Sequence, residues 1–124
     1  MTWLMVALGG ALGSMGRFGL AQALVRLDAF PFGTLLVNVL GSLVLGICAG
    51  LFDMEQKSRP VGLFLMVGFC GGFTTFSTFS LETLELMQQQ AWLKAGGNML
   101  LSVALCLLGT WLGFLLGQSL RKTA

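Results

Sequence analysis

The sequence predicts an all-α integral membrane protein with four transmembrane helices, and three observations support this fold class. Hydrophobic residues make up 56% of the 124 residues and charged residues only 10%, against roughly 25% charged residues in soluble domains. The mean hydropathy is +0.87. The charges leave four long apolar stretches, each near the roughly 20 residues that cross a bilayer. We therefore expect residues 1–124 to form one membrane domain, without a soluble catalytic or nucleotide-binding domain.

The first span is expected at about residues 3–22, a stretch rich in glycine that carries one charge, Arg17. The second span, about 33–52, follows a short connection that contains Arg26, Asp28 and Pro31. Proline is tolerated in the first turn of a helix, where its missing N–H has no intrahelical partner anyway. Pro31 is therefore expected to begin the second span.

The third span is expected at about residues 61–87, after a polar run from Asp53 to Pro60, and the fourth at about 95–117. The third stretch is longer than a helix needs to cross a bilayer. From Gly68 to Ser80 it reads GFCGGFTTFSTFS, which is rich in poor helix formers. We therefore expect a broken third helix, which also explains the excess length. Protein or a water-filled cavity would have to surround the break.

Several glycines recur at four-residue spacing, which allows helices to approach closely. They are Gly9/Gly13, Gly46/Gly50, Gly68/Gly72 and the run Gly109, Gly113, Gly117. Any one such pair can arise by chance in a membrane helix. Together they predict tight helix packing.

Two stripes of polar residues lie inside the second and fourth spans, each at steps of four that place its members on one helix face. The stripes are Thr34, Asn38 and Ser42 in the second span, and Asn98, Ser102 and Cys106 in the fourth. They suggest that the two spans face each other. Hydroxyl groups often bond the carbonyl four residues earlier, so a structural role is the alternative for them. Asn38 is the strongest candidate for function because its amide cannot be satisfied so locally.

Phe76 and Phe79 project from nearly the same face if the helix resumes after Thr75. An aromatic ring has a positive edge, so two aligned edges would line an anion path without the full charge that would trap an ion. The alternative is that Phe76 and Phe79 simply pack in the membrane interior. The interleaved hydroxyl residues of the TTFSTF sequence make this alternative less favoured. Arg17 is the one deeply placed cation; it would attract anions near a vestibule, or extend to the membrane interface instead.

The composition also excludes several kinds of site. The chain has no His, and its three cysteines (Cys48, Cys70 and Cys106) show no CxxC spacing, which rules out zinc, haem and Ser-His-Asp chemistry. We interpret the cysteines as small buried hydrophobic residues rather than disulfide partners. The net charge of +2 is too small and dispersed to suggest nucleic-acid binding. We expect no enzymatic activity.

The loop charges are nearly balanced. An even number of spans puts both termini and the 53–60 loop on one side of the membrane. The basic residues expected there are Lys57, Arg59, Arg121 and Lys122, against Arg26 and Lys94 on the other side. By the positive-inside rule this bias is weak. Either the chain inserts in both orientations, or the small difference orients every copy.

Three blocks stand in a recognisable order and spacing: GGALGSMGR (Gly9 to Arg17), PFGTLLVNVLGS (Pro31 to Ser42) and GFCGGFTTFSTF (Gly68 to Phe79). Through them the chain resembles the Fluc, or CrcB-type, family of fluoride ion channels over essentially its whole length. The third block is the most specific of the three.

The resemblance implies a fluoride-selective channel of the bacterial inner membrane that exports fluoride passively, lowers intracellular fluoride and confers fluoride resistance. It also implies a dual-topology, antiparallel homodimer in the lipid bilayer, with a structural Na⁺ at its centre. By the same resemblance, the backbone carbonyls of Gly71 and Thr74 would hold the Na⁺. The fluoride pore would be lined by Asn38, Phe76, Phe79, Thr34, Thr75, Ser77, Thr78 and Ser102, and the vestibule by Arg17 and Glu82.

The fourth span departs from the family, which often has a tyrosine one turn before Ser102, where this chain has Asn98. The main alternative function is a small dual-topology, proton-coupled multidrug exporter. Such an exporter needs a membrane-embedded carboxylate, typically in its first span, and the first span here has none. A non-transporting assembly subunit would explain the glycines, but neither Asn38 nor the TTFSTF sequence.

Overall fold

The computed structural model describes residues 1–24 and 30–123, which form helices and short connections with no β-strand in these ranges. Four helical segments are long and apolar enough to cross a membrane: Thr2–Leu24, Phe32–Leu51, Pro60–Gln88 and Trp92–Thr123. The all-α class with four membrane-spanning helices is therefore confirmed. Arg26 and Asp28, which were expected in the first connection, lie outside the described residues.

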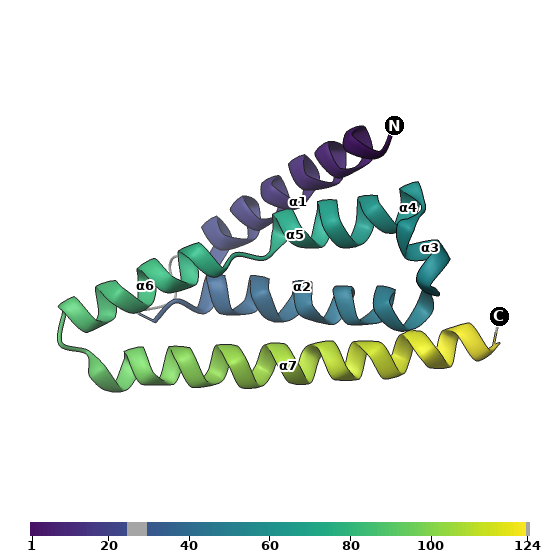
Figure 1. The fold of residues 1–124 in the computed structure, drawn as a ribbon. Coiled ribbons are helices and arrows are strands. Elements are labelled where there is room, and N and C mark those ends of the chain that lie inside the picture. Colours follow the sequence, from purple (N-terminus) through teal and green to yellow (C-terminus); the bar gives the residue numbers. More distant parts are fainter. Residues whose placement is uncertain (25–29, 124) are drawn as a thin grey trace.

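The first two spans are α1 (Thr2–Leu24) and α2 (Phe32–Leu51) (Figure 1). Pro31 stands at the N-cap of α2, one position before its first helical residue. The polar run after α2 forms the short helix α3 (Met54–Ser58), which begins with a capping box. In it, Asp53 Oδ1 accepts the Gln56 N–H at 2.8 Å, and the Asp53 N–H donates to Gln56 Oε1 at 3.0 Å.

The third span consists of α4 (Pro60–Gly62), the π-helical segment η1 (Leu63–Cys70), α5 (Gly71–Phe73) and α6 (Phe76–Gln88). Between α5 and α6 the backbone is extended, with φ −81° and ψ 154° at Thr74 and φ −150° and ψ 118° at Thr75. A tight turn then leads to α7 (Trp92–Thr123). This helix begins before the expected residue 95 and ends after 117, because the polar residues at its ends continue the helix. Polarity marks where a span leaves the bilayer, not where its helix stops.

The helices associate in two pairs, α1 with η1 and α5, and α2 with α7 along nearly all of α2 (Figure 1). The backbones meet at glycines in both pairs. A Cβ atom added to Gly13 would lie 2.2 Å from the carbonyl oxygen of Phe69, and one added to Gly50 would lie 2.2 Å from that of Phe114. Added Cβ atoms would also lie within 3.4 Å of the facing helix at Gly9, Gly46, Gly68, Gly72, Gly109, Gly113 and Gly117. The predicted tight glycine packing is confirmed.

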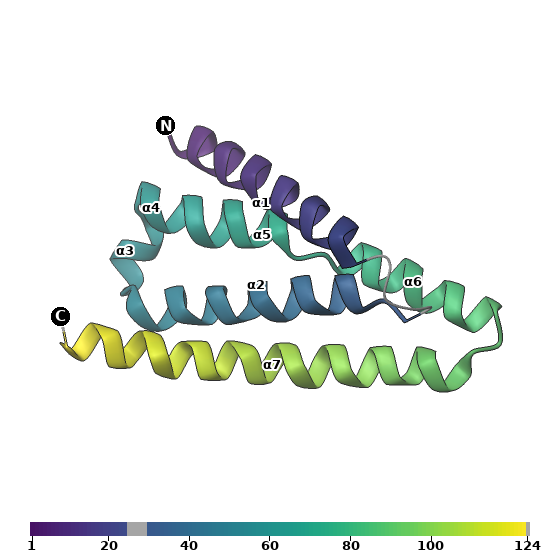
Figure 2. The same ribbon diagram turned by 180° about the vertical axis from the view of Figure 1, so that it is seen from behind.

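Both termini and α3 lie at the same end of the molecule, as an even number of spans requires (Figure 2). The three cysteines are free thiols, as predicted. Cys48 and Cys70 are buried, and Cys106 is half-buried. The other end of the bundle holds α6, which leans away from α5 toward the start of α7 (Figure 2).

Adding one methyl group at a glycine contact should destabilise the fold. In Gly113→Ala the new Cβ would lie 2.3 Å from the carbonyl oxygen of Leu43, so α2 and α7 would have to separate. We expect the free energy of unfolding in detergent to fall by about 1–3 kcal/mol, the usual cost of overpacking. Gly97→Ala on the same helix is the control, since its Cβ meets no atom within 4 Å. Equal stability of the two variants would contradict the proposed contact.

Candidate functional site

A single side chain from α2 bonds the interrupted backbone between α5 and α6. Asn38 Oδ1 accepts the Thr75 N–H at 2.7 Å, and Asn38 Nδ2 donates to the Thr75 carbonyl oxygen at 3.0 Å. A main chain inside a bilayer must have its polar groups satisfied by protein, since lipid offers no partner. The Asn38 amide meets this requirement for both polar main-chain groups of Thr75.

The two threonines of the interruption end one helix and begin the next. The N–H and the hydroxyl of Thr74 both donate to the carbonyl oxygen of Cys70, at 3.0 and 2.8 Å. Thr75 Oγ1 accepts the Thr78 N–H at 3.2 Å and so caps α6. The Thr75 hydroxyl in turn lies 3.1 Å from Thr78 Oγ1, to which it donates, and 3.2 Å from Ser77 Oγ.

A pocket of about 290 Å³, here called the ring pocket, opens beside this interruption. It is lined by Asn38, Ser42, Leu45, Thr74, Thr75, Phe76, Phe79, Ser102, Val103 and Cys106. The two rings stand with centroids 5.3 Å apart, and Phe76 is 78% exposed in the single chain. The last two members of each predicted polar stripe therefore line this pocket together.

Thr75 also lines a second pocket, of about 280 Å³, here called the arginine pocket. Its lining residues are Ser14, Arg17, Phe18, Ala21, Thr34, Val37, Thr75 and Thr78. No carboxylate among the described residues forms a salt bridge with Arg17. The Thr78 hydroxyl accepts from Thr75 and donates to none of the described groups. A positive charge and a free hydroxyl proton therefore share this pocket, which favours an anion.

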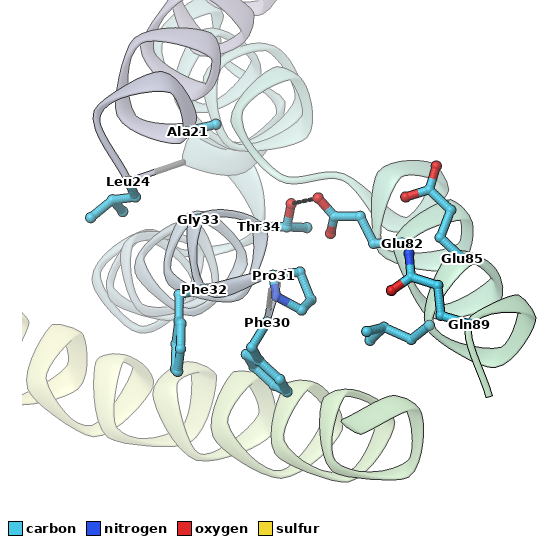
Figure 3. A pocket seen from close by; sticks show the side chains of 11 residues that line it. Ala21, Leu24, Phe30, Pro31, Phe32, Gly33, Thr34, Glu82, Glu85 and Gln89 are labelled. Atoms are coloured by element: carbon cyan, nitrogen blue, oxygen red, sulfur yellow. Dashed lines mark hydrogen bonds between the residues drawn. The ribbon is translucent and has the colours of Figure 1, made fainter. Parts of the chain in front are cut away.

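A third pocket, of about 240 Å³, adjoins the start of α2 and is here called the carboxylate pocket (Figure 3). Figure 3 shows Thr34 and Glu82 pointing toward each other, and Thr34 Oγ1 donates to Glu82 Oε1 at 2.7 Å. Glu82 Oε2 is buried and has no hydrogen-bond partner among the described residues. Thr34 lines this pocket and the arginine pocket, as Thr75 lines the arginine pocket and the ring pocket. The three pockets thus follow one another through shared threonines.

Most of the predicted site residues come together in these three pockets, but Ser77 and Gly71 do not line any of them. Ser77 is exposed and reaches only the Thr75 hydroxyl. Gly71 is exposed, and a Cβ atom there would meet nothing within 4 Å. Among the described residues no group of three or more His, Cys, Asp or Glu would hold a metal ion.

The sequence interpretation missed Ser14, Gly41 and Thr83. Ser14 lines the arginine pocket and donates to the Gly72 carbonyl oxygen at 3.4 Å. A Cβ at Gly41 would lie 2.3 Å from Thr74 Cγ2, so this glycine makes room for the interruption beside α2. Thr83 is buried and bonds Asn98. Spacing offered a signal for Ser14, one turn before Arg17, and for Thr83, one turn after Phe79.

Comparisons with known proteins give these features a family context. The sequence matches the family described as CrcB-like protein, Camphor Resistance (CrcB), over residues 4–114. A curated relative from Opitutus terrae, named fluoride-specific ion channel FluC, is 47% identical over 97% of this chain and 95% of its own length. A relative of the same name from Methylocella silvestris is 42% identical over 98% of this chain and 97% of its own length. Another, from Rhodospirillum rubrum, is 48% identical over 91% of this chain and 92% of its own length.

Removing the Asn38 amide should release the interrupted backbone. In Asn38→Leu the Thr75 N–H and carbonyl lose their partner. Because each unsatisfied buried group costs about 1–3 kcal/mol, we expect a less stable protein whose Thr75 amide exchanges with deuterium faster. Hydrogen exchange read by mass spectrometry on a peptide that spans Thr75 measures this. Ser42→Ala is the control, since Ser42 makes no hydrogen bond with its side chain within the described residues. Unchanged exchange in Asn38→Leu would show that this amide does not hold the interruption.

Proposed function

This chain belongs to the CrcB family, and from that premise we propose that it is a fluoride-selective ion channel that exports fluoride passively and thereby lowers intracellular fluoride. Relatives named as fluoride-specific ion channels match it over nearly its whole length. The protein is a transporter rather than an enzyme, and a multi-pass protein of the bacterial inner membrane. Within the structure, the observation that carries the proposal is the series of three pockets joined by shared threonines, in which the arginine pocket combines the Arg17 charge with a Thr78 hydroxyl proton that no described group accepts.

Fluoride is small and strongly hydrated, so a channel must replace its water with donors that each bind weakly enough to release it. In the arginine pocket, Arg17 would raise the local fluoride concentration, and the unused Thr78 hydroxyl would donate to the ion. Thr34 would not donate at the same time, because its proton is engaged by Glu82. The hydroxyl that remains free to donate to fluoride is therefore that of Thr78, next to Thr75.

In the ring pocket, Phe76 and Phe79 would offer their positive edges to fluoride. Asn38 Nδ2 has two N–H groups, and the Thr75 carbonyl takes only one of them. The second N–H would remain for the ion. Asn38 would then serve two purposes, since it holds the interruption and lines the path beside it.

For the interruption itself we propose a structural Na⁺ bound by the backbone carbonyls of Gly71 and Thr74. Unwound carbonyls at membrane depth are known cation ligands in transporters. Gly71 is exposed, and a Cβ atom added there would meet nothing within 4 Å, so this face of α5 is open in the single chain, which supports the assignment. Two carbonyls do not complete a coordination shell. A second copy of the chain related by a two-fold axis would supply the same pair again.

We also propose that the functional unit is an antiparallel, dual-topology homodimer, with each orientation supplied by a separate copy. Large apolar side chains stay exposed in the single chain on several helices. The loop charges give only a weak orientation signal. The helix α3, which contains Lys57 and precedes Arg59, lies at the same end as the last turn of α7 with Arg121 and Lys122, whereas the start of α7, with Lys94, lies at the other end (Figure 1). The exporter alternative is not favoured, because α1 has no carboxylate to carry a proton.

Purified protein in liposomes should release trapped fluoride without a proton gradient or ATP, because no group in α1 would carry protons. A fluoride electrode outside the liposomes measures the efflux. Efflux that depends on an imposed proton gradient would favour the exporter instead.

The same liposome assay can test the two phenylalanine rings with three protein variants. Phe76→Ile and Phe79→Ile keep apolar bulk but remove the ring edges, so efflux should fall sharply while assembly persists. Phe114→Ile is the matched control, because Phe114 lines none of the three pockets and should conduct like the parent. Full efflux in both Phe76→Ile and Phe79→Ile would refute the proposed pore chemistry.

A valine at Gly71 should disrupt assembly and leave the single chain intact. The added Cβ atom meets nothing within 4 Å in one chain, so a loss of dimer would report on the partner or the cation. We expect Gly71→Val to shift the protein to monomer by light scattering in detergent with Na⁺ present. Gly19→Val is the control, since that glycine is equally open in the single chain. A fully dimeric Gly71→Val would place Gly71 away from the dimer centre.

A further inference from the structure

A buried chain of hydrogen bonds joins α6 to α7 beside the ring pocket. Asn98 is 1% exposed, and Thr83 is 6% exposed. Asn98 Nδ2 donates to Thr83 Oγ1 at 2.9 Å, and the Ser102 hydroxyl lies 3.4 Å from Asn98 Oδ1. Thr83 Oγ1 donates to the Phe79 carbonyl oxygen at 2.7 Å. Asn98 itself lines none of the three pockets.

The hydroxyl of Thr83 determines which group donates in each of these hydrogen bonds. The Thr83 hydroxyl has a single proton and gives it to the Phe79 carbonyl, so Thr83 can only accept from Asn98. Asn98 must therefore present its NH₂ group to Thr83 and its carbonyl oxygen to Ser102. The Ser102 proton points at Asn98 as a result, away from the ring pocket that Ser102 lines.

Both ends of the chain of hydrogen bonds are residues of the ring pocket. One end is Ser102 on α7, and the other is Phe79 on α6. α7 packs mainly along α2 and only lightly on α6. Among the described residues, the bond between Asn98 and Thr83 is the one hydrogen bond that joins side chains of these two helices. This bond therefore links the α6 main chain at Phe79 to Ser102 on α7.

We propose that Asn98 is a positioning residue of the permeation path, which through Thr83 holds the main chain that carries the Phe79 ring and gives the Ser102 proton a resting acceptor. This inference rests on the proposed function of the ring pocket. The Ser102 contact is the longest of the three, at 3.4 Å, so its hydroxyl turns toward a passing fluoride at little cost. When the ion leaves, the Ser102 hydroxyl turns back and donates to Asn98 Oδ1 again. The amide thus occupies the place where the family often has a tyrosine, but it acts behind the pocket wall.

The test compares fluoride efflux from liposomes for three single variants and one double variant. Asn98→Leu and Thr83→Val each remove the hydrogen bond between positions 98 and 83 and keep a side chain of similar size. Each should lower efflux roughly fivefold, the factor that corresponds to one lost hydrogen bond. The double variant should be no slower than Asn98→Leu, because both changes remove the same link. Thr83→Ser keeps the hydroxyl and should conduct like the parent.

A second readout follows the ring directly and does not depend on efflux. With 4-fluorophenylalanine at position 79, the ¹⁹F resonance should move in Asn98→Leu and in Thr83→Val and stay in place in Thr83→Ser. An unmoved resonance in both disrupted variants would overturn the positioning role, and so would efflux losses that multiply in the double variant. A parent protein that passes no fluoride would overturn the proposed function instead. The resonance would still decide whether Asn98 positions the ring.

Discussion

An unwound main chain inside a membrane must find protein partners for its N–H and C=O groups, and Asn38 supplies both for Thr75. This contact exists only because α2 approaches the interruption closely at Gly41, where a methyl group would collide with Thr74. The two threonines close the helices on either side. The direction in which α6 leaves α5 depends on this one amide.

The glycine contacts hold together the helix pairs between which the interruption lies. Where backbones meet without side chains, as at Gly13 and Gly113, two helices form a rigid pair and need no polar group to hold them together. The polar side chains of α2 and α7 are then left for the pockets between the pairs. This division explains why a chain with so few polar residues lines three successive pockets with them. It also explains why α6, which lacks glycine contacts, needs the bond between Asn98 and Thr83.

The pockets differ in what they offer a ligand. Glu82 engages the Thr34 proton in the carboxylate pocket, whereas in the arginine pocket no described carboxylate pairs with Arg17 and no described group accepts the Thr78 proton. The ring pocket has no full charge in its lining, only an amide, hydroxyls and ring edges. An anion that moves from the arginine pocket to the ring pocket would pass from strong to weak attraction. That gradation is what conduction requires, because a site that binds too tightly does not release its ion.

Hydropathy and composition alone determined the four spans, because the cost of burying charge in lipid acts on each segment separately. The glycine contacts and the polar faces of α2 and α7 also followed from sequence, since helical periodicity is a local property. The pairing of polar groups did not. Thr34 meets Glu82 across 48 residues, and Asn38 meets Thr75 across 37. Which groups keep a free proton is therefore decided only by tertiary packing, which brings distant segments together in one register.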